Sequence, residues 1–491
     1  MIDLRGKRVL VMGLGVHGGG LGVAQWLLRQ GAALTVTDLA SPEALAGPLA
    51  VLHAAAAKAG VPVACTLGEH RAEDFTTHDL VVANPAVRPD SPWLALARAA
   101  GVPVETEMTL FFRACPGLIL GVTGTKGKTT TALLLGAMLR ERFPDTVVAG
   151  NMRVSALAAL DSIGATTPVV LELSSFQLER LGAAGFSPRY ALITNLSPDH
   201  LNWHGSMESY AAAKRQIYWH QSAGGVVALN GADDGSVEYF PPPAHGGRLI
   251  HVCAGPEWSR AAGRYPQPPA RPAATVVLRD ERVIWDDPLG AFGPPSPSGG
   301  ELLFRRDEVR LPGAHNLANA MMAAALARGF GVDAGSLRAA LRGFGGVEHR
   351  LELVRELDGV RYVNDTTATN PAAALAALET VPPPVVLIAG GADKNLEFTA
   401  LGAAIARRVK ALVLLEGSAT PRLLEAVGAA APGLPLISGP HSDFAAALRA
   451  ARALAAPGDT VLLSPGCASF GMFRNEFHRG EEFRRLVGEL T

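Results

Sequence analysis

The stretch Leu118-Ile-Leu-Gly-Val-Thr-Gly-Thr-Lys-Gly-Lys-Thr-Thr130 joins a short apolar run to a glycine-rich loop and then to a predicted helix. Backbone N–H groups in such a loop can surround phosphates, while Lys128 reaches the β and γ phosphate oxygens and the Thr129 hydroxyl can hold Mg²⁺. The loop departs from the strict GxxxxGK[ST] pattern, because Val122 stands where the first glycine would be. The stretch still predicts a phosphate-binding loop at the end of a strand in an α/β domain.

Working outward, apolar runs alternate with helix-like segments along the chain, which is typical of parallel α/β sheets. The pattern begins near the N-terminus and restarts at Leu118 and again near Val385. We therefore expect three α/β domains, at residues 1–105, 106–347 and 348–491. A Pro- and Gly-rich segment at about 240–300 is expected to elaborate one edge of the central domain. The expected strands are 9–13, 34–38, 80–84, 118–123, 169–173, 190–195, 274–278, 282–285, 385–390, 411–415 and 460–464.

The bulk composition is that of an ordinary globular protein, with 48% hydrophobic and 18% charged residues among 491. A formal net charge of −1 gives no reason to expect a nucleic acid or membrane partner. The four cysteines show no CxxC spacing, which argues against a zinc site or a disulfide framework and fits a reducing cytosol. No signal peptide or membrane-spanning run is recognisable. We expect a cytoplasmic monomer that acts on small molecules.

A second glycine-rich loop, Gly13-Leu-Gly15-Val-His-Gly18, follows the first predicted strand. Such a loop places backbone N–H groups and a helix N-terminus against a diphosphate. Asp38 ends the next strand, where the acid of a dinucleotide site would lie. The pattern favours the diphosphate of some nucleotide without defining which one. A nicotinamide-dependent dehydrogenase and a tight turn without any ligand are the alternatives.

Polar side chains follow two further strands of the central domain. Glu172 ends one apolar run, and His200 follows another in Asn195-Leu-Ser-Pro-Asp-His200. The carboxyl ends of parallel strands share one edge of a sheet, so both are expected near Thr129. A carboxylate there can bind Mg²⁺ directly or through water. Lys214, on a predicted helix, is by itself most simply a solvated charge.

The remaining candidate residues flank a domain boundary or lie in the third domain. Asn316 and Asn319 share one helix face and could pair with a base edge or a phosphate. Arg350 and Asp365 lie just past the boundary, where they could contact a nucleotide from the far side. Lys394, and the strand end that begins at Ser464, suggest a pocket for a small anion.

Together these motifs resemble the Mur ligase family, and most of all its glutamate-adding members, over nearly the whole chain. The specific segments are Gly-Thr-Lys-Gly-Lys-Thr-Thr, Glu-Leu-Ser-Ser-Phe-Gln-Leu-Glu and Leu-Leu-Ser-Pro-Gly-Cys-Ala-Ser. The resemblance implies an N-terminal Rossmann-like domain that binds UDP, a central P-loop ATPase domain with a parallel sheet, and a C-terminal Rossmann-like domain for the incoming amino acid. The first loop would then hold a UDP diphosphate.

The resemblance also implies roles for individual residues, including Lys128, His200 and Lys214 in catalysis. ATP would be bound by Gly124, Thr125, Lys126, Gly127, Lys128, Thr129, Thr130, Asn316, Asn319, Arg350 and Asp365. Two Mg²⁺ ions would be held by Thr129, Glu172, His200 and a carbamylated Lys214. The UDP-linked substrate would meet Gly15, Val16, His17, Asp38, Asn84, Asn151 and Ser174. The amino-acid pocket would be lined by Thr369, Lys394, Ser469 and Phe470.

The implied reaction is ATP-dependent ligation of glutamate, with the D isomer expected, to UDP-N-acetylmuramoyl-L-alanine through an acyl-phosphate, in peptidoglycan precursor synthesis. Rival readings are a Mur-type ligase for another amino acid, a folate polyglutamylation enzyme, a dinucleotide oxidoreductase and a non-catalytic nucleotide-binding regulator. The sequence departs from the family pattern at four places, which bear on the UDP and glutamate contacts. They are His17-Gly-Gly-Gly20, Asn84-Pro-Ala86, Thr367 and Glu476-Phe477.

Overall fold

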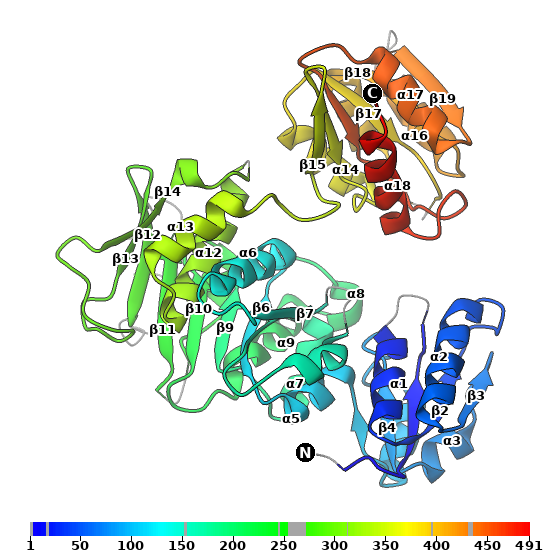
Figure 1. Cartoon of the computed structure of the whole chain (residues 1–491), viewed down its shortest axis with the longest axis vertical. Coiled ribbons are helices and arrows are strands. Elements are labelled where there is room, and N and C mark those ends of the chain that lie inside the picture. The colour runs from blue at the N-terminus through cyan, green and yellow to red at the C-terminus, as the bar shows by residue number, and fades with distance from the viewer. Residues whose placement is uncertain are drawn as a thin grey trace. The chain divides into compact units, whose positions relative to one another are not determined.

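The computed structural model describes residues 3–15, 19–151, 155–243, 246–253, 272–311, 313–393, 396–430 and 436–491. The chain forms two compact units, one of Met1–Arg310 with Ala314–Phe344 and one of Leu311–Gly313 with Gly345–Thr491. The first unit contains a five-stranded and a nine-stranded sheet, and the second contains a six-stranded sheet (Figure 1). The predicted α/β fold with parallel sheets is confirmed.

The N-terminal part of the first unit is a five-stranded parallel sheet covered on both faces. Its elements are β1 (Arg8–Met12), α1 (Gly19–Arg29), β2 (Ala33–Asp38), α2 (Ala46–Ala59), β3 (Val63–Leu67), α3 (Ala72–Thr77), β4 (Leu80–Ala83), α4 (Pro92–Ala99), β5 (Val104–Glu105) and α5 (Glu107–Ala114). The strand order is β3-β2-β1-β4-β5. Along β1, Val9 and Val11 pack with α1 and α2, whereas Leu10 and Met12 pack with α3 and α4. This alternation buries β1 on both faces, as expected for an inner parallel strand.

The central sheet carries the phosphate loop. Its elements are β6 (Leu118–Thr123), α6 (Lys128–Arg140), β7 (Val147–Gly150), η1 (Ala156–Ser162), β8 (Pro168–Glu172), α7 (Ser175–Ala183), β9 (Tyr190–Ile193), α8 (Leu201–His204), α9 (Met207–Trp219), β10 (Val226–Asn230), α10 (Asp234–Tyr239), β11 (Arg248–Cys253), β12 (Ala274–Arg279), β13 (Arg282–Asp286), β14 (Glu301–Arg305), η2 (Arg306–Glu308), α12 (Ala314–Phe330) and α13 (Ala334–Gly343). The order is β14-β13-β12-β11-β10-β9-β6-β8-β7, so β6 lies between β9 and β8. The 240–300 segment supplies β11, β12 and β13 toward one edge, where β13 pairs antiparallel on both sides.

The second unit is a six-stranded sheet between two helical layers. Its elements are β15 (Glu352–Leu357), β16 (Val360–Asn364), α14 (Pro371–Thr380), β17 (Val385–Ala389), α15 (Thr399–Arg408), β18 (Val409–Leu415), α16 (Thr420–Ala430), β19 (Leu436–His441), α17 (Phe444–Leu454), β20 (Thr460–Leu463) and α18 (Glu476–Gly488). The order is β15-β16-β20-β17-β18-β19, with β15 antiparallel to β16. Helices α14, α15 and α16 share one core with the sheet, and α17 and α18 share another. Two cores on opposite faces explain why β17 is buried throughout.

Candidate active site

The phosphate loop joins β6 to α6 and is fixed by the two residues that follow β9. The Thr125 N–H donates to the Asn195 carbonyl at 3.0 Å, and the Lys126 N–H donates to Asn195 Oδ1 at 2.9 Å. Asn195 Nδ2 and Thr194 Oγ1 both donate to the Lys126 carbonyl, at 2.9 and 2.7 Å. The loop is therefore preorganised by its neighbours. Neither Thr194 nor Asn195 was a predicted site residue, although their place at a strand end is a signal for them.

Two glycines give the loop its shape. Gly124 has φ +147° and Gly127 has φ +80°, both in the range that favours glycine. A Cβ on Gly124 would overlap Thr194 Oγ1, and one on Gly127 would overlap the Asn319 side chain. Gly127 also precedes the first residue of α6, whose first N–H groups lack intrahelical partners and can bind phosphate.

A buried carboxylate lies beside the first turn of α6. Thr129 Oγ1 donates to Glu172 Oε2 at 2.8 Å, and Asn151 Nδ2 donates to Glu172 Oε1 at 3.1 Å. Glu172 is only 2% exposed, and both of its oxygens accept a hydrogen bond. The structure thus brings together three predicted site residues from β8, α6 and the end of β7. Ser174, a fourth, accepts from the Gln177 N–H at 3.3 Å and caps α7.

Lys214 lies on α9 and is buried. Its Nζ donates to the Gly124 carbonyl at 2.7 Å and lies 4.6 Å from the centroid of the Tyr210 ring. Lys128 Nζ donates to the same carbonyl at 3.2 Å and to the Thr125 carbonyl at 2.9 Å. Burial, and then the charge of Lys128, hold the pKa of Lys214 well below its ordinary value. Lys214 is therefore a buried amine against the phosphate loop and not a solvated helix lysine.

His200 lies farther from this group. It precedes α8 with φ +52°, and its side chain is 48% exposed. Its ring is 5.0 Å from that of Phe176 and 6.3 Å from that of Tyr210, between centroids. His200 forms no hydrogen bond or ion pair with Glu172 or Thr129, all three being residues that the structure describes. Across the described residues, no group of three or more His, Cys, Asp or Glu side chains could hold a metal ion.

The two asparagines of α12 meet the loop from another side. Asn319 is buried and lies against Gly127, and its Nδ2 donates to Asn316 Oδ1 at 3.4 Å. Their spacing of three residues places both on one helix face. The structure therefore brings Asn319 to the phosphate loop, with Asn316 bonded to it.

The backbone of the first glycine-rich loop is held by hydrogen bonds to two nearby polar side chains. The Gly15 N–H donates to Asp38 Oδ2 at 3.0 Å, and Asn84 Nδ2 donates to the first glycine carbonyl of the loop at 3.5 Å. Asp38 thus fixes the loop backbone in this structure. Val16 and His17 lie outside the described residues.

In the second unit, Asp365 is a buried carboxyl at the end of β16. Ser464 Oγ donates to Asp365 Oδ2 at 2.7 Å, and the Leu351 N–H donates to Asp365 Oδ1 at 3.2 Å. Burial raises the pKa of Asp365 to about 7, against the opposing effects of these donors and of Arg350. This carboxyl therefore changes its charge near neutral pH.

The predicted amino-acid pocket is described only in part. Ser469 is buried, Phe470 is 56% exposed, and the Thr369 N–H donates to the Thr367 carbonyl at 2.9 Å. Lys394 lies outside the described residues. No hydrogen bond joins Thr369 to Ser469, both of which the structure describes.

Sequence reasoning gave no role to Arg479, which is fully buried on α18. Its Nε donates to Thr366 Oγ1 and its Nη2 to the Thr366 carbonyl, both at 2.9 Å. Longer bonds of 3.5 Å reach the Cys467 carbonyl. Burial lowers the pKa of Arg479 to about 10, which still leaves it charged at neutral pH. Arg479 thus fixes the loops that follow β16 and β20, which carry most of the predicted residues of this unit.

Comparison with known proteins identifies the family. Three family models match the chain: a MurD-like N-terminal domain of Mur ligases at residues 7–106, a Mur ligase middle domain at 122–241 and a Mur ligase glutamate ligase domain at 349–467. A protein of Roseiflexus sp. (strain RS-1), named UDP-N-acetylmuramoylalanine--D-glutamate ligase, is 55% identical over 100% of both chains. The chain belongs to the Mur ligase family. The predicted resemblance is confirmed.

A second relative agrees in sequence, and two solved structures agree in fold. A protein of the same name from Symbiobacterium thermophilum is 39% identical, over 99% of this chain and 98% of its own. The solved structure of UDP-N-acetylmuramate-alanine ligase MurC from Thermotoga maritima matches with a TM-score of 0.57 and 19% identity, covering 98% and 99% of the two chains. A pseudomurein peptide ligase type C from Methanothermus fervidus gives 0.53 and 16%, covering 99% and 100%. Among the described helices of this Mur ligase, none is long and apolar enough to cross a membrane.

Proposed function

We propose that this chain is an ATP-dependent ligase that joins D-glutamate to UDP-N-acetylmuramoyl-L-alanine in peptidoglycan precursor synthesis. The observation that carries the substrate assignment is the 55% identity, over both full lengths, with a ligase of that name. The preorganised phosphate loop with its buried carboxylate supports the use of ATP. A dinucleotide oxidoreductase would leave this loop without a role.

The proposed chemistry has two steps. The alanine carboxylate of the UDP-linked substrate attacks the γ-phosphorus of ATP, so that ADP leaves and an acyl-phosphate forms. The amino group of glutamate then attacks the acyl carbon, and phosphate leaves from the tetrahedral intermediate as the amide forms. The protein contributes positioning and charge stabilisation, for which the ammonium of Lys128 and the first N–H groups of α6 are suited.

The oxygen atoms beside the loop fit a magnesium ion. Glu172 accepts hydrogen bonds from two neutral groups, the Thr129 hydroxyl and the Asn151 amide, so its negative charge is available to a cation. Carboxylate and hydroxyl oxygens are ligands that Mg²⁺ prefers. We propose that Thr129 holds one Mg²⁺, and that Glu172, which is bonded to Thr129, serves a second together with His200 and Lys214. When bound, these ions would neutralise charge on the phosphates.

For Lys214 we propose carbamylation, in which the amine attacks CO₂, an N–C bond forms and a proton is released. The product is an anionic ligand with two oxygens. Support comes from the burial and lowered pKa of Lys214, because a free amine is the reactive form. The protonated amine would instead be a further cation beside Lys128 and the two proposed Mg²⁺ ions.

The remaining assignments complete the proposal. Domains at 1–105, 106–347 and 348–491 would bind the UDP-linked substrate, ATP and glutamate, in a cytoplasmic monomer. Arg350 and Asp365 would contact the nucleotide. The UDP diphosphate would lie on the loop that contains Gly15, and glutamate would lie near Thr369, Lys394, Ser469 and Phe470.

The test is phosphate release from ATP with UDP-N-acetylmuramoyl-L-alanine and a panel of D and L amino acids. We expect release with D-glutamate and little with L-glutamate, alanine or diamino acids. Release that is fastest with another amino acid would replace the glutamate assignment. Release that needs no UDP-linked acceptor would overturn the ligase assignment.

A further inference from the structure

A buried carboxylate lies where the two sheets of the first unit are joined. Glu107 is in the first turn of α5, directly after β5, and is 8% exposed. Ser155 Oγ donates to Glu107 Oε1 at 2.6 Å, and the backbone N–H groups of Ala156 and Leu157 hydrogen-bond to the same carboxylate. Burying a carboxylate is costly unless such donors compensate it. Glu107 therefore holds the start of η1 in one position.

The same serine touches the helix that follows the first glycine-rich loop. A Cβ on Gly22 of α1 would lie 2.5 Å from Ser155 Cβ and 2.8 Å from its Oγ. Only a glycine allows this approach, so α1 and Ser155 meet at nearly backbone distance. A shift of α1 along its axis must therefore displace Ser155 or break its contact.

Four positions before Ser155, the chain is fixed to the ATP site. The Asn151 N–H donates to the Glu172 carbonyl at 2.8 Å, and the Asn151 side chain donates to the Glu172 carboxylate. Glu172 in turn accepts from Thr129. Asn151 and Ser155 are thus held by two different buried carboxylates, one in each half of the unit.

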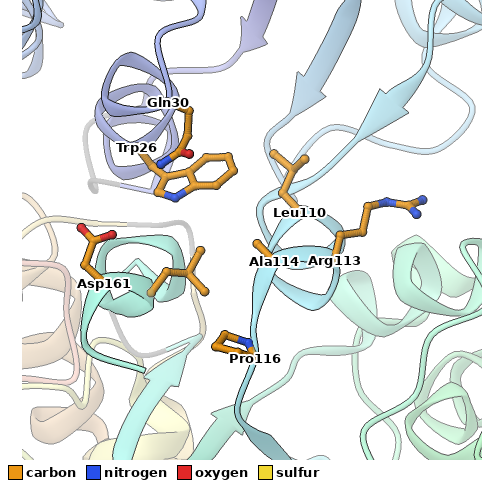
Figure 2. Close-up of a pocket in the computed structure, with 8 residues that line it drawn as sticks. Trp26, Gln30, Leu110, Arg113, Ala114, Pro116 and Asp161 are labelled. Carbon is orange, nitrogen blue, oxygen red and sulfur yellow. The ribbon is translucent and has the colours of Figure 1, made fainter. Parts of the chain in front are cut away.

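Beyond this joint the same three elements pack incompletely. A cavity of about 210 Å³ lies between α1, α5 and η1 (Figure 2). Its lining consists of Trp26 and Gln30 from α1, Leu110, Arg113 and Ala114 from α5, Pro116, and Leu160 and Asp161 from the end of η1. At the far side of the cavity Arg29 Nε of α1 lies 3.7 Å from Asp161 Oδ2, both with largely solvent-accessible side chains, so the close buried approach of α1 to the start of η1 is the one at Gly22 and Ser155, where Glu107 acts.

We propose that Glu107 is a positioning residue that couples the binding of the UDP-linked substrate to the ATP site. The inference rests on the proposed function. Diphosphate bound at the first loop fixes the start of α1, and α1 contacts Ser155. Glu107 holds Ser155, which lies four positions along the chain from the residue bonded to Glu172. Without the carboxylate, the affinity for each ligand no longer depends on whether the other is bound.

The test measures the Kd of UDP-N-acetylmuramoyl-L-alanine by calorimetry, with and without a non-hydrolysable ATP analogue. In the wild type we expect the analogue to tighten substrate binding roughly five- to tenfold, within the usual range of coupling between sites. Glu107→Gln keeps the shape but offers an NH₂ group to donors that need an acceptor. It should reduce the coupling to less than about twofold. Ser155→Ala, which removes one donor, should do the same and provides the test if the glutamine variant does not fold.

Leu160→Ala is the matched control, because it weakens packing between the same three elements, at the cavity beyond the joint, without touching Glu107. It should lower the melting temperature and keep the coupling. Equal loss of coupling in Leu160→Ala would mean a merely structural role and would overturn the proposal, as would full coupling in Glu107→Gln or none in the wild type. If the wild type binds no UDP-linked substrate, the proposed function fails and the coupling falls with it. If the wild type binds the UDP-linked substrate and Glu107→Gln leaves the effect of the ATP analogue on its Kd unchanged, only the coupling proposal fails.

Discussion

Replacing Asp365 with asparagine should stabilise the second unit at neutral and alkaline pH. Burial raises the pKa of this carboxyl from 3.8 to about 7 in the folded state. Since the folded pKa lies above the unfolded one, the folded state binds the proton more tightly. The contribution of this proton binding to the free energy of unfolding is complete below about pH 4 and is lost as pH rises through about 7. Three pKa units at about 1.4 kcal/mol each correspond to about 4 kcal/mol, of which roughly 1 kcal/mol is lost between pH 6 and pH 8.

Asparagine reproduces the neutral carboxyl without the titration. Its oxygen can accept from the Leu351 N–H, and its NH₂ group can donate to Ser464 Oγ, so both contacts survive. Asp365→Asn should therefore be more stable than the wild type by as much as about 4 kcal/mol at pH 8 and by less at pH 6.

Hydrogen exchange of the amides in β16, corrected for intrinsic rates, measures this quantity inside the second unit. Asp358→Asn, an exposed aspartate at φ +52° where asparagine is tolerated, is the control and should change little. If wild-type protection is unchanged from pH 6 to pH 8, or if Asp365→Asn is less protected at pH 8, the buried carboxyl does not titrate as argued.

Three further predictions concern the phosphate loop. Lys128→Ala should reduce phosphate release at least 100-fold, since a preorganised charge of this kind is worth about 3–4 kcal/mol, while calorimetry shows an unchanged Kd for the UDP-linked substrate; retention of a tenth of the turnover would contradict the assignment. Gly127→Ala should abolish ATP binding in a fluorescent-nucleotide assay, because its Cβ meets the Asn319 side chain at a positive φ; wild-type affinity would refute the steric argument. Lys214→Ala should be inactive in phosphate release and partly rescued by a small carboxylate such as formate, and Lys214→Arg should stay inactive; an active arginine variant would exclude the carbamate.

Several inner strands were predictable because their apolar runs are continuous, although the inner strands β10, β11 and β16 were not expected. β4, β8 and β17 are buried at every position, and the sequence indicates each of them. The edge strands β3 and β19 were not expected, because two of the five residues of β3 and four of the six of β19 are exposed and neither strand carries a clear apolar pattern. Whether a segment forms the edge strand of a sheet depends on how segments distant in the sequence pack against it.

The candidate site divides in the same way. The proximity of Thr129 and Glu172 follows from a general rule, since the carboxyl ends of parallel strands meet at one edge. Glu107 and Arg479 could not be found this way, because a single charged residue on a helix reads as solvated surface until its tertiary partners are known. Lys214 lies between these cases: the family resemblance indicated it, and only the fold shows that it is buried.

Lys128 donates hydrogen bonds to the carbonyls of Gly124 and Thr125, so these loop carbonyls compete with a bound phosphate for its ammonium group. An incoming phosphate must replace these carbonyls around the ammonium before it can interact fully with the positive charge of Lys128. A nucleotide whose chain stops short of Lys128 can occupy the loop without making this exchange. The binding free energy that a triphosphate gains at Lys128 is therefore smaller than its attraction to the ammonium alone, because the two internal contacts are lost in the exchange.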